Sequence, residues 1–225
     1  MARAHDVGGH TGLGPIEIEA DEPVFHDAWE ARIFGIMMAG FGKGLFNVEQ
    51  FRAGIEGIHS IAYLKAQYYE RWLSTLEENL IRVGIVTEDD LDRRTVELSH
   101  ATDTEMPRRE EPEFCEMLMS VIEGGFSPER EIEGAHAFDL GDRVFARGTD
   151  APGHTRLPRY VRDKQGVVVR LDKAFVYPET SATGAGEHPE WCYCVRFDAA
   201  EIWGQRAERD APVFVDVWES YLEAA

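Results

Sequence analysis

The sequence predicts an α+β protein in which an extended N-terminal arm and a helical domain precede a small β-barrel. Three observations predict this order. Glycine and proline crowd the first 25 residues, apolar side chains then recur at helical spacing, and the last third of the chain holds short alternating runs. We expect the arm over residues 1–25, the helical domain over 26–130 and the barrel over 131–225.

The arm contains six glycine or proline residues between positions 8 and 23. Such a segment cannot pack on itself, so we expect it to move freely or to drape over a partner. Five helices should follow, near residues 29–38, 48–58, 60–83, 88–99 and 113–123. Asn47 with Gln50 and Thr87 with its acidic successors are N-terminal capping signals, and Gly84 is a typical C-terminal stop.

Beyond a polar linker at 101–112 and the last helix, four short runs are rich in β-branched and aromatic residues. They occupy residues 142–147, 166–170, 191–197 and 213–218, with glycine, proline and aspartate between them. Four or five short strands in about 90 residues indicate a small barrel.

Composition excludes several classes of protein. The 225 residues are 44% hydrophobic, and 23 basic against 42 acidic side chains give a formal charge of −19. This acidity opposes nucleic-acid binding, and no apolar run reaches the roughly 18 residues of a membrane span. The polar N-terminus lacks the apolar core of a signal peptide, and three cysteines form no disulfide framework, so a cytoplasmic location is expected.

No motif of a self-contained active site is present. The serine-hydrolase, zinc-protease, phosphate-loop and dinucleotide-binding signatures are all missing. His188, Cys192 and Cys194 could supply zinc ligands, because alternate residues of a strand face one side. A fourth ligand has no suitable spacing, and strand cysteines also pack as small apolar groups. We therefore predict no metal site in this chain.

Three features leave two interpretations open. Tyr68, Tyr69 and Trp72 fall within about one helical turn and form either core or a ligand pocket. Arg52 either pairs with Glu56 on a helix surface or is partly buried and needs an anion. The segment 154–170 has five basic side chains, Arg156 among them, against one acid; it forms either a solvated strand edge or a contact surface.

Several separated blocks of sequence together carry a family likeness. They are His5-Asp6-Val7-Gly8-Gly9, Gly12-Leu13-Gly14-Pro15, Asp21-Glu22-Pro23-Val24-Phe25-His26, Trp29-Glu30, Phe51-Arg52-x-Gly54-Ile55-Glu56, Tyr68-Tyr69-x-x-Trp72, Gly153-His154-Thr155-Arg156-x-Pro158-Arg159-Tyr160-Val161-Arg162, Tyr193-x-Val195-Arg196-Phe197, Trp203-Gly204 and Trp218-Glu219-x-Tyr221-Leu222-Glu223. In these blocks and their order, the chain resembles the nitrile hydratase β-subunit family along essentially its whole length.

The resemblance implies half of an enzyme that hydrates a small nitrile to an amide. The partner would be an α subunit whose Cys-x-x-Cys-Ser-Cys loop, with two oxidised cysteines, holds low-spin Co(III) or Fe(III) as a Lewis acid. The assembly would be an αβ heterodimer or its α2β2 pair, with the arm wrapped around the α subunit. The C-terminal barrel would be SH3-like. Trp72 resembles the cobalt-type members and Glu70-Arg71 the iron-type ones; cobalt is preferred.

The resemblance also implies roles for individual residues. Arg52 and Arg156 would hold the anionic oxidised cysteines, to which a guanidinium is suited. Tyr68 would donate a hydrogen bond near the metal. The apolar wall of the substrate pocket would be formed by Trp72, Met37, Val48 and Phe51.

Three other functions remain open. One is the matching subunit of a thiocyanate hydrolase, in which this chain is divided into two polypeptides; a single continuous chain favours nitrile hydratase. The second is a non-enzymatic SH3-like module that binds nucleic acid, which the net charge of −19 opposes. The third is a maturation chaperone that resembles only the helical half, which the presence of a complete barrel opposes.

Overall fold

The computed structural model describes residues 4–10, 12, 14–16, 18–101, 104, 109–148, 153–207 and 211–225. The chain divides into two compact units, each described here by itself. Glu19–Ser127 form the helical unit, and Met1–Ile18 together with Pro128–Ala225 form the sheet unit.

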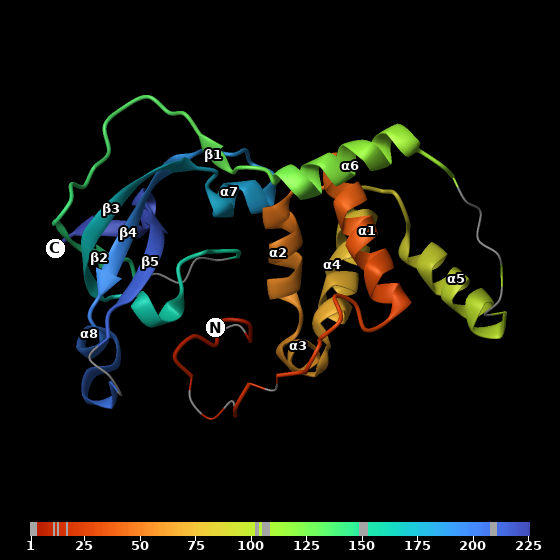
Figure 1. The fold of residues 1–225 in the computed structure, drawn as a ribbon, viewed down its shortest axis with the longest axis horizontal. Helices are drawn as coiled ribbons and strands as arrows, with labels where there is room; N and C mark the ends of the chain where they lie inside the picture. The colour runs from red at the N-terminus through yellow and green to blue at the C-terminus, as the bar shows by residue number, and fades with distance from the viewer. Residues whose placement is uncertain are drawn as a thin grey trace. The chain divides into compact units, whose positions relative to one another are not determined.

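The described residues of the helical unit form α1 (Ala28–Gly42), α2 (Val48–Gly57), α3 (Ser60–Lys65), α4 (Tyr68–Arg82), α5 (Glu88–His100) and α6 (Pro112–Gly124) (Figure 1). Both predicted capping signals are confirmed. The Asn47 side chain accepts from the backbone N–H of Gln50 at 2.8 Å, and Thr87 accepts from that of Asp90 at 3.1 Å. These caps satisfy backbone donors that the first turn of a helix leaves unpaired.

The prediction of one continuous helix from residue 60 to 83 is wrong, because the chain bends between α3 and α4. The second helix has its own cap, where the Glu70 carboxylate accepts from the backbone N–H of Gln67 at 2.7 Å. Arg71 closes the bend by donating to the carbonyls of Tyr63 and Ala66, at 3.1 and 2.9 Å. The carbonyls that the break leaves without helical partners are thus satisfied by a side chain.

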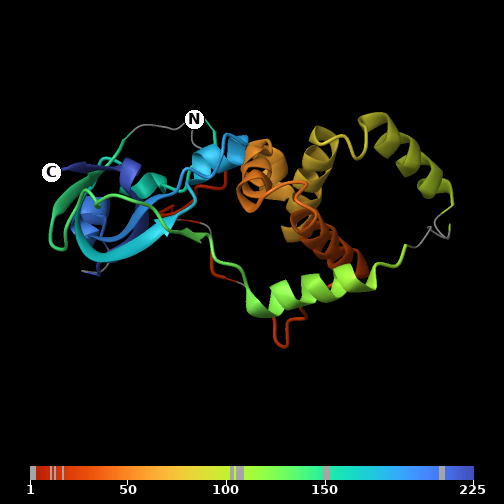
Figure 2. The same cartoon turned by 90° about the horizontal axis from the view of Figure 1, so that it is seen from above.

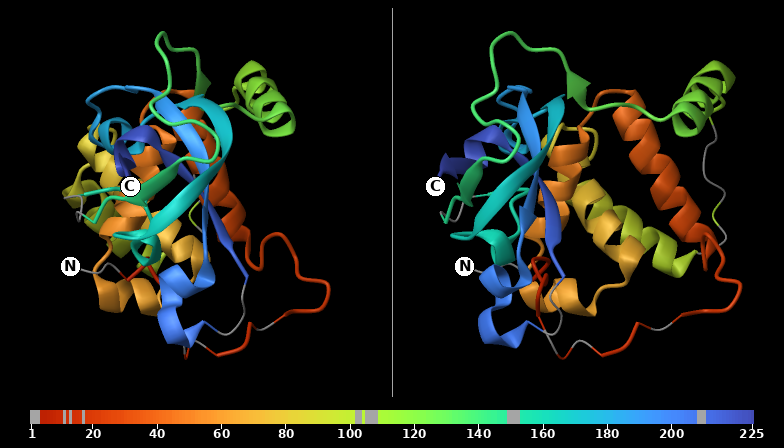
Figure 3. Two further views of the ribbon diagram at one scale, coloured as in Figure 1. Left: turned by 90° about the vertical axis from the view of Figure 1, so that its left-hand side faces the viewer. Right: turned by 60° about the vertical axis from the view of Figure 1, so that its left-hand side comes forward.

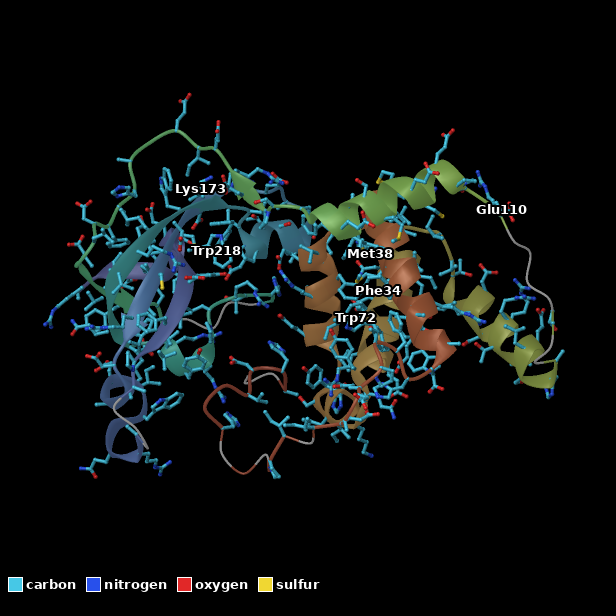
Figure 4. The ribbon with its side chains drawn as sticks, in the orientation of Figure 1. Phe34, Met38, Trp72, Glu110, Lys173 and Trp218 are labelled. Carbon is cyan, nitrogen blue, oxygen red and sulfur yellow. The ribbon has the colours of Figure 1, made fainter. Side chains whose placement is uncertain are left out.

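The core of the helical unit lies between α1, α2 and α4. Its buried side chains are Ile33, Met37, Phe46, Phe51 and Leu76, and Phe34, Met38 and Trp72 pack around them (Figure 4). Gly54 brings α2 close to α4, since a Cβ there would lie 2.9 Å from the Cβ of Thr75. The C-terminal end of α1 lies beside α6 (Figure 2). There a Cβ at Gly42 would lie 2.6 Å from a methyl carbon of Leu118 and 3.2 Å from the ring of Phe114.

The sheet unit contains one antiparallel sheet. Its strands are β1 (Glu129–Arg130), β2 (Arg143–Ala146), β3 (Gln165–Phe175), β4 (Glu190–Phe197), β5 (Val213–Trp218) and β6 (Leu222–Ala224). They are ordered β5-β4-β3-β2-β6, with β1 added to β3, and the strands twist strongly (Figure 3). The four predicted strands are confirmed. In the described part of the chain β5 and β6 do not pair, so the expected closed barrel is corrected to an open sheet, and the SH3-like label stays a prediction.

The core of the sheet unit is larger than that of the helical unit. Twelve buried residues form it, among them Phe197, Tyr193 and Tyr221. Two short helices, α7 (Pro178–Thr183) and α8 (Ala199–Trp203), and the 3-10 turns η1 (Arg159–Val161), η2 (Gly204–Arg206) and η3 (Glu219–Tyr221) complete the unit. Across the described residues, no helix is both long and apolar enough to cross a membrane.

The first part of the arm packs on the sheet unit. A Cβ at Gly8 would lie 2.6 Å from carbons of the Tyr160 ring, and a Cβ at Gly9 would collide with the ring of Trp203. Gly9 also has φ +75°, which glycine adopts without strain. The arm thus packs on its own chain at these two glycines, a contact that the sequence did not predict.

Candidate functional site

Arg52 lies on the exposed side of α2. Its Nη1 donates to Oε1 of Glu49 at 2.7 Å. Glu49 is mostly buried, with 11% of its side chain exposed, whereas 44% of the Arg52 side chain is exposed. Sequence reasoning considered only Glu56 as a partner and missed Glu49, which precedes Arg52 by three residues and so shares its helix face.

The aromatic residues at the start of α4 divide between core and surface. The ring of Trp72 meets the ring of Phe51 edge to face, with 5.2 Å between the ring centroids. Tyr69 and Trp72 both pack against the helical core. The ring centroid of Tyr68 lies 5.1 Å from that of Tyr69 and 5.3 Å from that of Trp72, yet Tyr68 is 60% exposed. Partial burial raises the pKa of the Tyr69 hydroxyl. A core role thus explains Tyr69 and does not explain Tyr68.

Two of the other apolar residues predicted for the pocket, Met37 and Phe51, belong to the core against which Tyr69 and Trp72 pack. Met37 and Phe51 are buried core residues, at 7% and 4% exposure, and Val48 is half-buried at the start of α2. The ring of Phe34 in α1 stacks on that of Trp72, with 6.5 Å between the ring centroids (Figure 4). The helical unit therefore brings together four of the seven predicted site residues, Met37, Phe51 and Trp72 with Tyr68 at their surface, and it carries Arg52 on the same helix as Val48 and Phe51. Their roles stay predictions.

Arg156 belongs to the sheet unit and is exposed. Its backbone N–H donates to the hydroxyl of Tyr221 at 3.4 Å, and the hydroxyl of Thr155 donates to the same oxygen at 3.2 Å. Burial raises the pKa of Tyr221, so this phenol stays protonated. Asp6 of the arm accepts from the backbone N–H of Arg159 at 3.2 Å, at the start of η1.

The basic segment 154–170 does not lie on an edge strand, because β3 has β4 on one side and β2 on the other. Its first residues form an irregular segment and η1, while Arg170 lies in β3. There Arg170 donates to Asp172 at 2.7 Å and to Asp216 at 3.1 Å, and the Asp172 carboxylate raises the pKa of its guanidinium.

The cysteines of β4 have the environment of core residues. Cys192 and Cys194 are 4% and 5% exposed. Burial raises the pKa of the Cys192 thiol to about 12, so it is protonated at neutral pH and packs as a small apolar group. His188 lies in an exposed loop, where its Nε2 is 3.1 Å from the carbonyl of Ala185. Among described residues, the ligand atoms that come together are those of Glu19, Glu22 and His26, all exposed.

Comparison with known proteins gives matches over both halves of the chain. The profile "Nitrile hydratase beta subunit, N-terminal" matches residues 1–115, and "Nitrile hydratase beta subunit, C-terminal" matches residues 127–224. The low-molecular weight cobalt-containing nitrile hydratase subunit beta of Rhodococcus rhodochrous is 42% identical over 223 residues, 99% of either chain. The cobalt-containing nitrile hydratase subunit beta of Pseudonocardia thermophila is 39% identical over 224 residues, 99% of this chain and 96% of that one.

A more distant relative matches only part of the chain. The thiocyanate hydrolase subunit alpha of Thiobacillus thioparus is 31% identical over 96 residues, which are 42% of this chain and 76% of that one. The nitrile hydratase subunits are therefore similar along the whole chain, and the thiocyanate hydrolase subunit along less than half of it.

Proposed function

The chain belongs to the nitrile hydratase β-subunit family, and on that premise we propose how its side chains serve the hydration of nitriles to amides. It is a subunit of the enzyme, and its relatives imply an α subunit as partner. We propose an αβ heterodimer, or its α2β2 pair, in which the α subunit holds the metal.

The cysteines of this chain support a metal centre in the partner. A low-spin Co(III) or Fe(III) ion needs strong anionic donors, and the two thiols of β4 are buried and protonated. Cobalt is the preferred ion, because two relatives that match nearly the full length are named as cobalt-containing. When bound in the α subunit, the ion would supply Lewis-acid activation of water or substrate.

Arg52 and Arg156 would grip the oxidised cysteines of the α subunit. The observation that carries this proposal is the half-exposed guanidinium of Arg52, whose Nη1 donates to Glu49. Because a guanidinium carries five N–H donors in a plane, it can hold Glu49 and an oxyanion at once. Glu49 would then orient the Arg52 guanidinium toward the partner subunit.

The aromatic cluster would form one wall of the substrate pocket. Trp72, Met37, Val48 and Phe51 would offer the apolar surface that a nitrile's organic group requires. Tyr68 is 60% exposed in this chain, so its hydroxyl can reach a group supplied by the partner. It would donate a hydrogen bond near the metal.

The second part of the arm would bind the α subunit. Ile16, Ile18 and Val24 are 89%, 90% and 82% exposed, and apolar side chains so exposed in one segment are typical of an interface.

The free cysteines, with Cys115 exposed, support a location in the reducing cytoplasm.

The arginine roles are tested by replacing arginine with lysine in the assembled enzyme. Arg52→Lys and Arg156→Lys keep the charge and lose the planar fork, so each should lower turnover at least about tenfold, the equivalent of about 1.4 kcal/mol. Cobalt content and cysteine oxidation must stay normal in both variants.

Arg94→Lys is the matched control. Arg94 pairs with Glu97 three residues on, at 2.6 Å, with 39% of its side chain exposed, so its geometry is close to that of Arg52 and Glu49. Surface pairs of this kind contribute well under about 1 kcal/mol. Turnover equal in all three variants would show that Arg52 and Arg156 do not grip the metal centre.

A further inference from the structure

A hydroxyl of α4 holds the peptide group that precedes Arg52. Thr75 is fully buried, and its Oγ1 donates to the carbonyl oxygen of Phe51 at 2.9 Å. That carbonyl and the backbone N–H of Arg52 belong to one planar peptide unit. Thr75 therefore contacts the backbone from which the Arg52 side chain leaves the helix.

The contact adds to the ordinary hydrogen bonding of α2. In an α-helix the carbonyl of Phe51 accepts from the N–H four residues on, and its second lone pair is usually left to solvent or to a side chain. Here a second helix fills that position. The rotation of α2 about its own axis is consequently set by α4, and the direction of a long side chain on α2 changes with that rotation.

The sequence makes room for this contact at one glycine. A Cβ at Gly54 would collide with Oγ1 of Thr75 and lie 2.9 Å from its Cβ. Any larger residue would force the two helices apart and lengthen the bond from Thr75 to Phe51. Gly54 and Thr75 thus act as a matched pair at the crossing of the helices.

Thr75 is itself held in place by polar groups of α4. Asn79, 3% exposed, donates from Nδ2 to the carbonyl of Thr75 at 2.8 Å and to its Oγ1 at 3.2 Å. Arg82 in turn donates to Oδ1 of Asn79 at 2.9 Å. Because Oγ1 receives a bond from Asn79, its own proton is directed to Phe51. A valine has about the same volume but lacks the hydroxyl that Asn79 and Phe51 use, so this network depends on hydrogen bonding and not on shape alone.

We propose that Thr75 is a positioning residue for the reaction, acting through Arg52. Thr75 fixes the backbone at residues 51–52, Phe51 meets Trp72 edge-on at 5.2 Å, and Glu49 orients the guanidinium. The arginine fork and the apolar wall are thereby held in one geometry by a single buried hydroxyl. The inference rests on the proposed role of Arg52.

The experiment compares variants of the assembled αβ enzyme. Thr75→Val removes the hydroxyl and keeps the shape, and Thr75→Ser restores the hydroxyl. Misplacing a catalytic group by about 1 Å can cost about a hundredfold in rate, so a smaller shift in Thr75→Val should lower kcat by about tenfold with KM changed less than about twofold. Thr75→Ser should recover most of kcat.

Two further readouts separate positioning from stability. The visible absorption band of the metal centre should shift in Thr75→Val in the same direction as in Arg52→Lys. In the Arg52→Lys background, Thr75→Val should lower kcat by less than about twofold, because both changes act on one interaction. Ile33→Val, which trims a core residue of α1 at 6% exposure, is the control and should lower Tm without moving kcat or the band.

The measurements on Arg52→Lys and Thr75→Val distinguish failure of the Arg52 role from failure of the Thr75 role. If Arg52→Lys keeps full turnover, the proposed role of Arg52 fails, and that of Thr75 fails with it. If Arg52→Lys is impaired while Thr75→Val has normal kcat and an unshifted band, or if their losses are additive, only the inference about Thr75 is overturned. Should Thr75→Val not assemble, Thr75→Cys, of similar volume and with a weak S–H donor, is measured in its place.

Discussion

The two units hold their arginines in different ways. Arg52 rises from a regular helix, its partner Glu49 lies three residues away, and the peptide before it is held from α4, 24 residues away. Arg156 lies in an irregular segment, and its N–H bonds to Tyr221, 65 residues away. The side chain of Arg52 is therefore oriented by a partner on its own helix. The backbone of Arg156 is held by a contact between distant parts of the chain, and that contact requires the sheet unit to be folded.

The largest effect should come from the core of the sheet unit. Phe197→Ala removes a fully buried ring, which should lower the free energy of unfolding by about 3–5 kcal/mol. Val48→Ala in the helical unit trims a half-buried side chain and should cost only about 1 kcal/mol, with the main change in substrate affinity. Chemical denaturation measures both. Equal losses would contradict the difference between a core residue and a pocket residue.

The two units should also differ in how fast their cysteine thiols are alkylated. Cys115 of α6 is exposed, whereas burial raises the pKa of Cys192 to about 12. At pH 8 only about one Cys192 in ten thousand would be thiolate, so Cys115 should react with iodoacetamide at least about a hundredfold faster. Mass spectrometry of the labelled peptides follows both sites in the folded chain. Fast labelling of Cys192 would show that β4 is not the core strand described here.

Tyr221→Phe tests the long-range support of Arg156. The change leaves the hydroxyl of Thr155 and the N–H of Arg156 without their acceptor, which should lower the free energy of unfolding by about 1–3 kcal/mol. Turnover of the assembled enzyme should fall as well, because the Arg156 backbone loses its anchor. Unchanged stability together with unchanged turnover would mean that the phenol does not hold this segment.

The smallest effect should be at α5, which has no buried residue. Thr87→Ala removes a capping box and should cost about 1 kcal/mol, confined to that helix. Hydrogen exchange should quicken in the first turn of α5 and stay unchanged in α4. Faster exchange throughout the helical unit would show that α5 is coupled to its core.

Local signals in the sequence predicted much of the helical unit. Apolar spacing and the caps at Asn47 and Thr87 placed α2 and α5 within one or two residues. The break between α3 and α4 was missed because aromatic residues continue across it, and the groups that stabilise it, Arg71 and two carbonyls, are brought together only by the bend. Periodicity carries no information on such a contact.

The sheet unit was predicted less completely because its contacts join distant residues. The four longer strands follow from alternation, but β1 and β6 span two and three residues and exist only through pairing with β3 and β2. For the same reason the sequence did not point to the contact of Tyr221 with Arg156, and in the helical unit it did not point to the contact of Thr75 with Phe51. Both contacts join a side chain to a backbone group far along the chain, and residue spacing carries no information on them.

In the proposed function, this chain contributes side chains, and its partner the metal, to one nitrile-hydrating site. The most direct measurement is cobalt and iron content together with amide formation from a nitrile, for the purified chain alone and for the chain co-purified with the α subunit. We predict no stoichiometric metal and no amide from the chain alone, and both from the αβ complex. A purified single chain that binds cobalt or iron tightly and hydrates a nitrile would contradict it.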